Sequence, residues 1–429
     1  MANKDFKPGI EQAKALDKAD VLYRFRERFF PLADNKIYMD GNSLGLASKD
    51  AEQALLQVME VWKSEGILIW NVESGHYFNY GKNLGNRVGR LINAQENEVM
   101  ITANTTLNIH QVIATFWKPT KERYKILVDD LNFPTDRYAV DSQIALKGMK
   151  VEEVLKVVES SDGVFIDEDA VIEAMTPDVA VILLPSVLYR SAQLLDMQRL
   201  TNEAHKRGIY IGFDLCHSIG AVAHDFDLIN PDFAIWCNYK YLSAGPGSTA
   251  GLYINKKHFN KSVGLAGWFG NKDETQFQLK HEFEQASDIT AFQTGTPNIF
   301  SMAPLEGVLN IYEEAGMEHI RAKSLNLTAY MMYLIDTRLR LYGYSYNNET
   351  EDYKRGGHIA LVHEEAYRIC LALKHHNIIP DYREPNVIRL APIALYNSYQ
   401  EVYKLIEVLE VIGQEQQWNN FSNQRAIVI

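Results

Sequence analysis

Residues 208–252 (GIYIGFDLCHSIGAVAHDFDLINPDFAIWCNYKYLSAGPGSTAGL) contain two short apolar runs, and each run ends in reactive polar residues. The run IYIGF is followed by Asp214 and then His217, and the run FAIWC is followed by Tyr239 and Lys240. Short apolar runs bounded by Gly, Ser and Pro are typical of buried strands in a parallel sheet. Ligands of open α/β sheets bind beyond the carboxyl ends of the strands, so we expect these polar groups to face one crevice.

Asp214 and Lys240 are the two kinds of group that pyridoxal phosphate needs most from a protein. A carboxylate can pair with the pyridinium nitrogen, and a lysine can hold the cofactor as a Schiff base. A lysine that acts as a base near neutral pH needs its pKa lowered by partial desolvation, because a free lysine has a pKa of about 10.4. A pyridoxal-phosphate site is therefore the working hypothesis.

The composition is that of a globular protein, since 46% of the 429 residues are hydrophobic, and the length allows two domains. A formal net charge of −12 argues against nucleic-acid or anionic-membrane partners. Cys216, Cys237 and Cys370 show no metal-ligand spacing, so no metal is expected, and their odd number favours a reducing compartment. No apolar span approaches the roughly 20 residues that cross a bilayer, and we predict a cytoplasmic location.

The order of apolar and amphipathic segments predicts an α/β protein. Helical patterns occur at 83–92, from 107, at 167–175 and at 195–207, and strand patterns at EVMITA, YKILVDD, 151–157 and VAVILLP. An amphipathic helix is expected over 10–30, and a long helical region over 300–341 with a break near Gly316. We expect a large, mainly parallel-sheet domain over residues 61–309 and a small α+β domain formed by residues 1–60 and 310–429.

Two further segments have the residues of a site for a phosphate and an aromatic ring. Thr105 and Thr106 lie between a predicted strand and helix, where hydroxyls and free amides bind anions, although simple N-capping would explain them equally. Phe133 and Asp136 follow the next strand, where Phe133 could stack on a planar cofactor and Asp136 could accept a hydrogen bond. The alternative is a turn with a capping aspartate.

Other loop residues allow both a structural and a functional explanation. Asn42 and Ser43 lie in the turn YMDGNSLG, and the loop 66–80 carries Trp70 and Tyr77. Aromatic residues in such a loop either pack on the domain surface or line an aryl-binding pocket.

Two exposed loops and one strand supply the remaining candidates. Trp268 and Thr296 lie in GLAGWFG and AFQTGTPNI, and a subunit interface would explain such exposed residues. Arg389 in VIRLAP could bind a carboxylate bidentately, or it could pair with an acid in its own sheet.

Eight motifs in the chain carry a family resemblance. In sequence order they are YMDGNSLG, ANTTLNIH, FPTDRYAVDSQ, FDLCHSIGAV, WCNYKYLSAGPG, GWFG, FQTGTPNI and IRLAPIALYNSY, and they span residues 38–399. This ordered set resembles the kynureninases, fold-type-I pyridoxal-phosphate enzymes of the aspartate-aminotransferase superfamily. The resemblance implies hydrolytic Cβ–Cγ cleavage of L-kynurenine or 3-hydroxykynurenine to anthranilate or 3-hydroxyanthranilate and L-alanine.

The resemblance also implies roles for residues. Lys240 would hold the cofactor as a Schiff base and act as the base at the substrate Cα, Asp214 would pair with the pyridine nitrogen, and Tyr239 is the candidate general acid-base group. The implied cofactor contacts are Thr105 and Thr106 at the phosphate, Phe133 on the ring, Asp136, Asp214, His217, Tyr239 and Lys240, with Trp268 and Thr296 reaching across a homodimer interface. The implied substrate contacts are Arg389 at the carboxylate, Asn42 and Ser43 near it, and Trp70 and Tyr77 at the aryl group.

One position departs from the family pattern. Pro185 stands where a threonine or serine is expected, so Ser186 would have to supply the corresponding cofactor hydrogen bond.

Three other functions share part of this pattern. A cysteine desulfurase or related class V aminotransferase has the same fold, but a desulfurase needs a mobile nucleophilic cysteine after the lysine, and Cys370 lies in the apolar helical run AYRICLALK. A non-enzymatic cofactor-binding regulator would need a further binding module, for which the chain has no spare segment. A nicotinamide-binding Rossmann enzyme would need a GxGxxG motif in its first βα unit, and none is present.

Overall fold

The computed structural model describes residues 6–424, and its largest element is a seven-stranded sheet. The strand order is β2-β8-β7-β6-β5-β3-β4, and β8 alone runs antiparallel to its neighbours. The strands are β2 (Val99–Ile101), β3 (Lys125–Asp129), β4 (Leu155–Val158), β5 (Val179–Pro185), β6 (Tyr210–Asp214), β7 (Phe233–Trp236) and β8 (Gly251–Ile254). The expected α/β fold with a mainly parallel sheet is confirmed.

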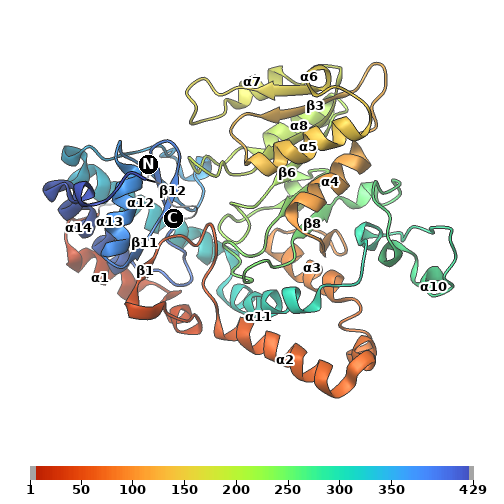
Figure 1. Cartoon of the computed structure of the whole chain (residues 1–429), viewed down its shortest axis with the longest axis horizontal. Helices are drawn as coiled ribbons and strands as arrows, with labels where there is room; N and C mark the ends of the chain where they lie inside the picture. The colour runs from red at the N-terminus through yellow and green to blue at the C-terminus, as the bar shows by residue number, and fades with distance from the viewer. Residues whose placement is uncertain (1–5, 425–429) are drawn as a thin grey trace.

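Both faces of this sheet are buried. Along β5, Ile182 and Leu184 pack into one core, while Val181 and Leu183 pack into the other, because side chains alternate across a strand. The helices on the first face include α3 (Tyr80–Leu91) and α8 (Met197–Lys206), and those on the second are α4 (Thr105–Phe116) and α5 (Pro134–Leu146) (Figure 1). Burial on both faces explains why these strands are continuous apolar runs.

A second unit, shown mostly in blue in Figure 1, is built largely from the C-terminal part of the chain. Its antiparallel sheet has the order β12-β13-β10-β9, from β9 (Ser345–Tyr346), β10 (Ile359–Val362), β12 (Asp381–Arg383) and β13 (Val387–Leu390). The helices around it are α12 (Met317–Leu334), α13 (Ala366–His375) and α14 (Tyr399–Glu415). The N-terminal β1 (Ile37–Tyr38) pairs in parallel with β11 (Ile378–Ile379), so both ends of the chain contribute to this unit.

The N-terminal helix is shorter than the sequence pattern predicts. α1 covers only Ile10–Ala19, and a 3₁₀ helix, η1, follows at Tyr23–Arg28. The Asp20 side chain accepts a hydrogen bond from the backbone N–H of Leu22 at 2.9 Å, which turns the chain and ends the regular helix. The strand expected at 151–157 is also partly wrong, because residues 151–154 form a helical turn, α6 (Val151–Val154), before β4 begins.

α2 (Lys49–Glu65) and α11 (Ile299–Ala315) pack on each other along the lower edge of Figure 1. They approach closely at Gly307, where a Cβ atom would lie 2.1 Å from the carbonyl oxygen of Asp50. The expected break at Gly316 is confirmed, since this residue has φ 77° and separates α11 from α12. The expected domain boundaries after residues 60 and 309 fall inside α2 and α11, so that division stays a prediction.

The remaining helices are short and connect the larger elements. They are η2 (Ala33–Asn35), η3 (Gly66–Ser74), α7 (Glu168–Glu173), α9 (Phe226–Ile229), η4 (Lys256–His258), η5 (Trp268–Gly270), α10 (Asp273–Gln276), η6 (Ile289–Phe292), the π-helical η7 (Ile335–Leu339), η8 (Arg340–Tyr342), η9 (Asp352–Lys354) and η10 (Gln417–Asn420). Within residues 6–424 no helix is both long and apolar enough to cross a membrane.

Candidate active site

A pocket of about 290 Å³, called here the Lys240 pocket, lies where the ends of β6 and β7 meet the two arginines of the small sheet. Its lining residues are Asn42, Ser43, Thr105, Thr106, Asn132, Phe133, Thr135, Val187, Tyr189, Asp214, Cys216, His217, Tyr239, Lys240, Arg383 and Arg389. Most of the predicted site residues therefore come together from segments that are far apart in the sequence.

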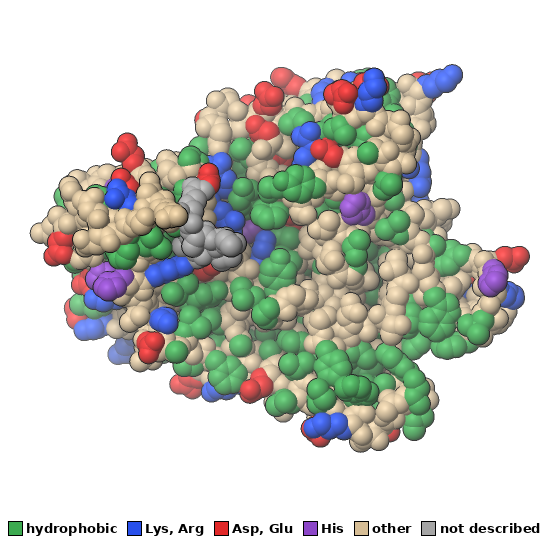
Figure 2. All heavy atoms as spheres, viewed as in Figure 1, with side chains coloured by type: hydrophobic (Ala, Val, Ile, Leu, Met, Phe, Trp, Pro, Cys, Tyr) green, Lys and Arg blue, Asp and Glu red, His purple; other side chains and the backbone are tan. Residues whose placement is uncertain are grey.

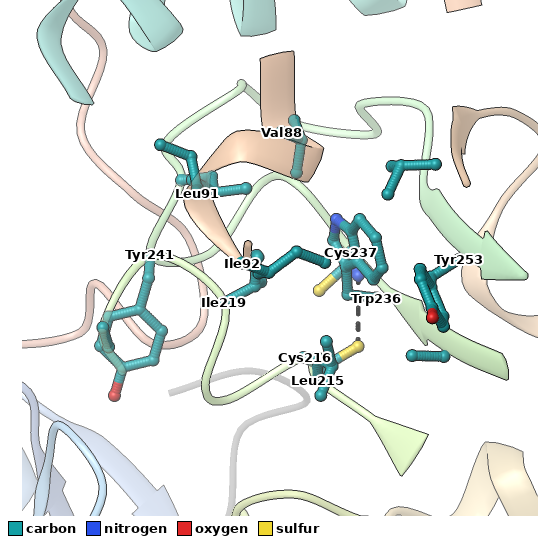
Figure 3. Packing of buried hydrophobic residues seen from close by; sticks show 14 of the residues in the cluster. Val88, Leu91, Ile92, Leu215, Cys216, Ile219, Trp236, Cys237, Tyr241 and Tyr253 are labelled. Carbon is teal, nitrogen blue, oxygen red and sulfur yellow. Dashed lines mark hydrogen bonds between the residues drawn. The ribbon is translucent and has the colours of Figure 1, made fainter. Parts of the chain in front are cut away.

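The backbone pairing of β6 with β7 places the two reactive strand ends side by side. Asp214 is opposite Ile235 in the parallel register, and the N–H of Leu215 donates to the carbonyl of Ile235 at 2.8 Å. Beyond the strands the N–H of Cys237 donates to Cys216 Sγ at 3.3 Å, within the apolar packing shown in Figure 3. This buried packing fixes the positions from which the acid and the lysine project.

Lys240 is half-buried, and its Nζ lies 3.0 Å from His217 Nε2. Burial lowers the pKa of His217 well below its usual value, and the nearby Lys240 adds to this effect. For Lys240, burial disfavours the ammonium while Cys237, Cys216 and Asp214 favour it, and its pKa is raised overall. The neutral imidazole thus accepts a hydrogen bond from the lysine ammonium, and the raised pKa of Lys240 differs from the lowered pKa that the sequence predicts for a base.

Asp214 and Asp136 form a buried carboxyl pair beside the lysine. Asp214 Oδ1 accepts the N–H of Cys216 at 2.7 Å, and Asp136 Oδ2 accepts Asn132 Nδ2 at 2.6 Å. Burial and the neighbouring Asp214 raise the pKa of Asp136 well above its usual range. Asp136 Oδ1 is buried and has no hydrogen-bond partner among the described residues, so the protonated form of this carboxyl is favoured beside Asp214. Asp136 lies behind Asp214 and does not line the pocket.

Two helices begin at the wall of the pocket. α4 starts at Thr105 and is capped by Asn104, whose side chain accepts from the N–H of Leu107 at 2.9 Å. Thr106 Oγ1 and Thr135 Oγ1 lie 2.9 Å apart, which brings the first turns of α4 and α5 together. Hydroxyl groups and free N–H groups at two helix N-termini are suited to an anion.

Other parts of the wall are aromatic and cationic. Phe133 precedes α5 with 41% of its surface exposed, and Lys240 Nζ is 5.9 Å from the centre of its ring. Arg389 is only 1% exposed, and it donates to Asp381, to the Tyr189 carbonyl at 3.0 Å and to Ser43 Oγ at 2.9 Å. Arg389 therefore pairs with an acid of its own sheet and also lines the pocket, and its role at a substrate carboxylate stays a prediction.

Besides Asp136, four predicted residues lie outside the Lys240 pocket. Trp70, Trp268 and Thr296 line a different pocket of about 870 Å³, called here the apolar pocket, together with residues such as Leu68. Tyr77 is 5% exposed and packs edge-on against Tyr80 in the core. One chain by itself thus does not bring these residues to Lys240.

Ser186 also points away from the pocket. It is fully buried, its Oγ donates to the Asp214 carbonyl at 2.9 Å, and it lies 2.8 Å from Ser218 Oγ. It therefore supports the end of β6 and does not supply the hydrogen bond expected in place of one lost at Pro185.

Sequence reasoning missed six residues of the pocket wall, namely Asn132, Thr135, Val187, Tyr189, Cys216 and Arg383. Thr135 and Asn132 lie in the same turn as Phe133 and could have been found by asking which hydroxyls and amides flank it. Arg383 lies six residues before Arg389, but only the hairpin of β12 with β13 shows that both face one space.

The chemistry of the pocket fits pyridoxal phosphate. The Asn42 amide is fully buried in the wall, and neither of its polar atoms has a partner in the described part of the chain. His217 Nδ1 is a second buried atom without a partner there. Together with the acid, the lysine and the two helix N-termini in the same wall, these groups leave donors and acceptors for a polar, phosphorylated ring. No group of His, Cys, Asp or Glu residues within 6–424 could hold a metal ion.

The architecture is that of fold-type-I pyridoxal-phosphate enzymes. The apo cysteine desulfurase from Thermococcus onnurineus matches with a TM-score of 0.78 over 91% of this chain and 98% of that chain, at 18% identity. A C-DES variant with glycine covalently linked to its PLP cofactor matches with a TM-score of 0.77 over 90% and 99%, at 16% identity. At these identities the likeness establishes the fold alone.

The sequence comparisons define the family more narrowly. Residues 320–409 match the model of the kynureninase C-terminal domain. Kynureninase from Bacillus cereus is 52% identical over the full length of both chains, and kynureninase from Geobacillus thermodenitrificans is 50% identical over 98% of both. The chain belongs to the kynureninase family, and it is a pyridoxal-phosphate-dependent enzyme that cleaves kynurenine hydrolytically. The desulfurase alternative is disfavoured further because Cys370 is fully buried in α13.

Proposed function

We propose that the residues of the Lys240 pocket together catalyse the hydrolytic Cβ–Cγ cleavage of L-kynurenine, or 3-hydroxykynurenine, to an anthranilate and L-alanine, and that each has a separate role. The observation that carries the proposal is that Lys240, Asp214 and Arg389 line one pocket. These are the groups needed for a Schiff base, a pyridinium nitrogen and a substrate carboxylate. When bound, pyridoxal phosphate supplies the electron sink for the carbon–carbon cleavage.

Residues of the pocket wall orient the cofactor. Thr105 and Thr106 hold the phosphate at the start of α4, and Thr135 adds a third hydroxyl from α5. Phe133 covers one face of the ring. Its exposed position beside Lys240 supports this role.

The acids and His217 fix the charge on the other side of the ring. Asp214, which accepts the N–H of Cys216, pairs with the ring nitrogen, while Asp136 stays protonated because burial and Asp214 raise its pKa. His217 stays neutral because burial lowers its pKa, so its Nε2 can take the hydrogen bond from Lys240 and its Nδ1 can donate to the cofactor. This arrangement adds no second positive charge beside the ring.

Lys240 and Tyr239 move the protons of the reaction. Lys240 would take the proton from the substrate Cα and hold it at Nζ beside His217. Cys237 together with burial raises the pKa of Tyr239, so its phenol stays protonated and can donate to an oxygen of the substrate. A hydrogen bond from Tyr239 to the phosphate is the alternative use of the same hydroxyl.

The substrate amino acid is bound at the wall opposite the lysine. Arg389 binds the α-carboxylate, and Ser43 fixes the direction of its guanidinium through a 2.9 Å hydrogen bond. Asn42 supplies a buried amide for a polar group of the substrate. Trp70 is proposed for the aryl group, which it would reach from a second subunit, whereas Tyr77, buried in the core of its own chain, would support that loop from behind.

The chain is proposed to act as a homodimer with active sites at the subunit interface. Trp268 and Thr296 line the apolar pocket, and hydrophobic side chains gather around the end of α2 and near α10 at the lower right of Figure 2. Ile67 is 78% exposed and Phe277 66% exposed at this surface. Burying such a surface against a second copy is favourable, and it would bring residues of this surface near the partner's cofactor. The cytoplasmic location stays a prediction.

The test of the function is turnover of L-kynurenine and of 3-hydroxykynurenine by the holoenzyme, followed by the fluorescence of the anthranilate product. L-Cysteine, and an amino acid with 2-oxoglutarate, serve as control substrates. We expect anthranilate and equimolar L-alanine, with neither sulfide nor a new amino acid from the controls. Sulfide or transamination without anthranilate would contradict the assignment.

A further inference from the structure

Arg383 is a second arginine in the wall of the Lys240 pocket. Its Nε donates to Asp381 Oδ2 at 2.9 Å, and Arg389 donates to the same oxygen. The two guanidinium groups therefore lie side by side on the hairpin that β12 forms with β13, although Arg389 is opposite Asp381 and Arg383 is opposite Val387 in the register. Both are 6.0 Å from the centre of the Tyr189 ring.

The two arginines differ in how many of their N–H groups are already engaged. Arg389 uses its Nε, Nη1 and Nη2 for Asp381, the Tyr189 carbonyl and Ser43 Oγ. Arg383 uses only Nε, and within the described part of the chain its Nη1 and Nη2 make no hydrogen bond. Its side chain is also 34% exposed, whereas that of Arg389 is 1% exposed. Most of the free donor capacity of this wall thus belongs to Arg383.

The charges at this wall favour an anion. Arg383 and Arg389 face the pocket and share a single carboxylate, Asp381, while the other nearby acid, Asp40, is not among the lining residues. A guanidinium with four free N–H groups matches the geometry of a carboxylate. The α-carboxylate of an amino acid is attached to the carbon whose amine must reach the Lys240 site, so it is the anionic group of the substrate nearest to this wall.

We propose that Arg383 is a second substrate-binding residue, which shares the α-carboxylate of the substrate with Arg389. This inference rests on the proposed function, in which Arg389 binds that carboxylate. Arg389, fixed by Ser43 and Tyr189, sets the direction of the carboxylate, and Arg383 closes over it with the donors that Asp381 leaves free. Selectivity for amino acids over the corresponding amines then depends on both arginines.

The test compares Arg383→Gln and Arg383→Lys holoenzymes with the unaltered protein on two ligands. One ligand is L-kynurenine, for which KM and kcat are measured by anthranilate fluorescence. The other is the amine that keeps the aryl ketone but lacks the α-carboxylate, whose dissociation constant is measured from the absorbance change of the bound cofactor. Arg340→Gln is the matched control, because Arg340 is an exposed arginine that pairs with Asp336 away from the pocket.

We expect Arg383→Gln to raise KM for L-kynurenine about tenfold while kcat changes less than about twofold, as for an interaction made equally in the ground and transition states. The dissociation constant of the amine should change less than about twofold, and Arg383→Lys should recover part of the lost affinity. Equal weakening of both ligands would place Arg383 at the aryl ketone, and loss of cofactor affinity would place it on the cofactor. Either outcome overturns the proposal.

The failure of this inference can be told apart from failure of the proposed function. An unchanged KM in Arg383→Gln, combined with a raised KM in an Arg389 variant, refutes the role of Arg383 alone. No anthranilate from the unaltered protein would instead refute the function on which it rests.

Discussion

Arg389 Nη2 donates a hydrogen bond to Ser43 Oγ at 2.9 Å, and this contact joins two residues that are 346 positions apart. Ser43 lies in the turn after β1, and Arg389 lies in β13 of the small sheet. The pocket therefore depends on the N-terminal segment being docked on the C-terminal unit. The pairing of β1 with β11 provides this docking.

Arg389→Lys should raise KM for L-kynurenine about ten- to hundredfold, because lysine keeps the charge but loses the planar fork that binds a carboxylate bidentately. Cofactor affinity should stay within about twofold, which a titration of the apoenzyme with pyridoxal phosphate will show. An unchanged KM would place the carboxylate elsewhere in the pocket.

Lys240→Ala should abolish the absorbance band of the covalently bound cofactor, because the variant cannot form the Schiff base. It should also lower kcat by at least about a thousandfold, because the base at the substrate Cα is lost. Lys206→Ala is the matched control, since Lys206 is an exposed lysine on α8. Retention of the band in Lys240→Ala would show that another lysine holds the cofactor.

The stability of the protein should depend on the ionisation of Asp40. Burial, with the nearby Asp381, raises the pKa of Asp40 to about 6, although Ser43, Arg389 and Arg383 oppose this shift. The folded state therefore holds the proton more tightly than the unfolded state, so this group's contribution is greatest at low pH and is lost as the pH rises through about 6. Between pH 5 and pH 8 the loss is about 1 kcal/mol.

Asp40→Asn removes this titration. The free energy of unfolding of the variant minus that of the unaltered protein should therefore be about 1 kcal/mol larger at pH 8 than at pH 5. Urea unfolding at both pH values measures the difference. Asp273→Asn, an exposed substitution in α10, should show no such change. A pH-independent difference for Asp40→Asn would contradict the raised pKa.

Two glycines on the same face of α3 allow a matched test of helix–sheet packing. A Cβ atom at Gly85 would lie 2.1 Å from the carbonyl oxygen of Val99, whereas one at Gly89 would make an ordinary 3.4 Å contact with the Val99 side chain. Gly85→Ala should lower the free energy of unfolding by about 1–3 kcal/mol, since backbone must shift. Gly89→Ala should be neutral or stabilising by up to about 1 kcal/mol, because alanine favours the helix. Similar urea midpoints for both variants would refute the close approach.

A charge placed in the apolar pocket should weaken the proposed homodimer. Leu68→Glu should raise the dissociation constant of the dimer at least about tenfold, because a carboxylate must then be desolvated at the interface. Leu146→Glu is the control, as Leu146 is 76% exposed at the end of α5 and lies outside this pocket. Sedimentation measurements on both variants decide the matter, and equal dissociation constants would place the interface elsewhere.

The sequence by itself determined the α/β class and the acid–lysine pair. Buried parallel strands must be continuous apolar runs, and such runs at 208–252 place Asp214 and Lys240 at neighbouring strand ends. The eight ordered motifs were also sufficient to indicate the kynureninase family, because they fix side chains that the reaction uses. The local errors lie at the N-terminus and at β4, where a side-chain hydrogen bond at Asp20 and a helical turn before Leu155 override the apolar periodicity.

Only the tertiary structure decided which loop residues face the pocket. The hairpin of β12 with β13 places Arg383 beside Arg389, and the hydrogen bond between Thr106 and Thr135 joins two helix starts. The tertiary structure also places Trp70, Trp268 and Thr296 in a different pocket from Lys240, and it buries Tyr77 in the core. The periodicity of a sequence shows which face of a helix or strand is apolar. Which distant loops meet depends on how whole helices and strands pack on one another, and a local stretch of sequence does not contain this information.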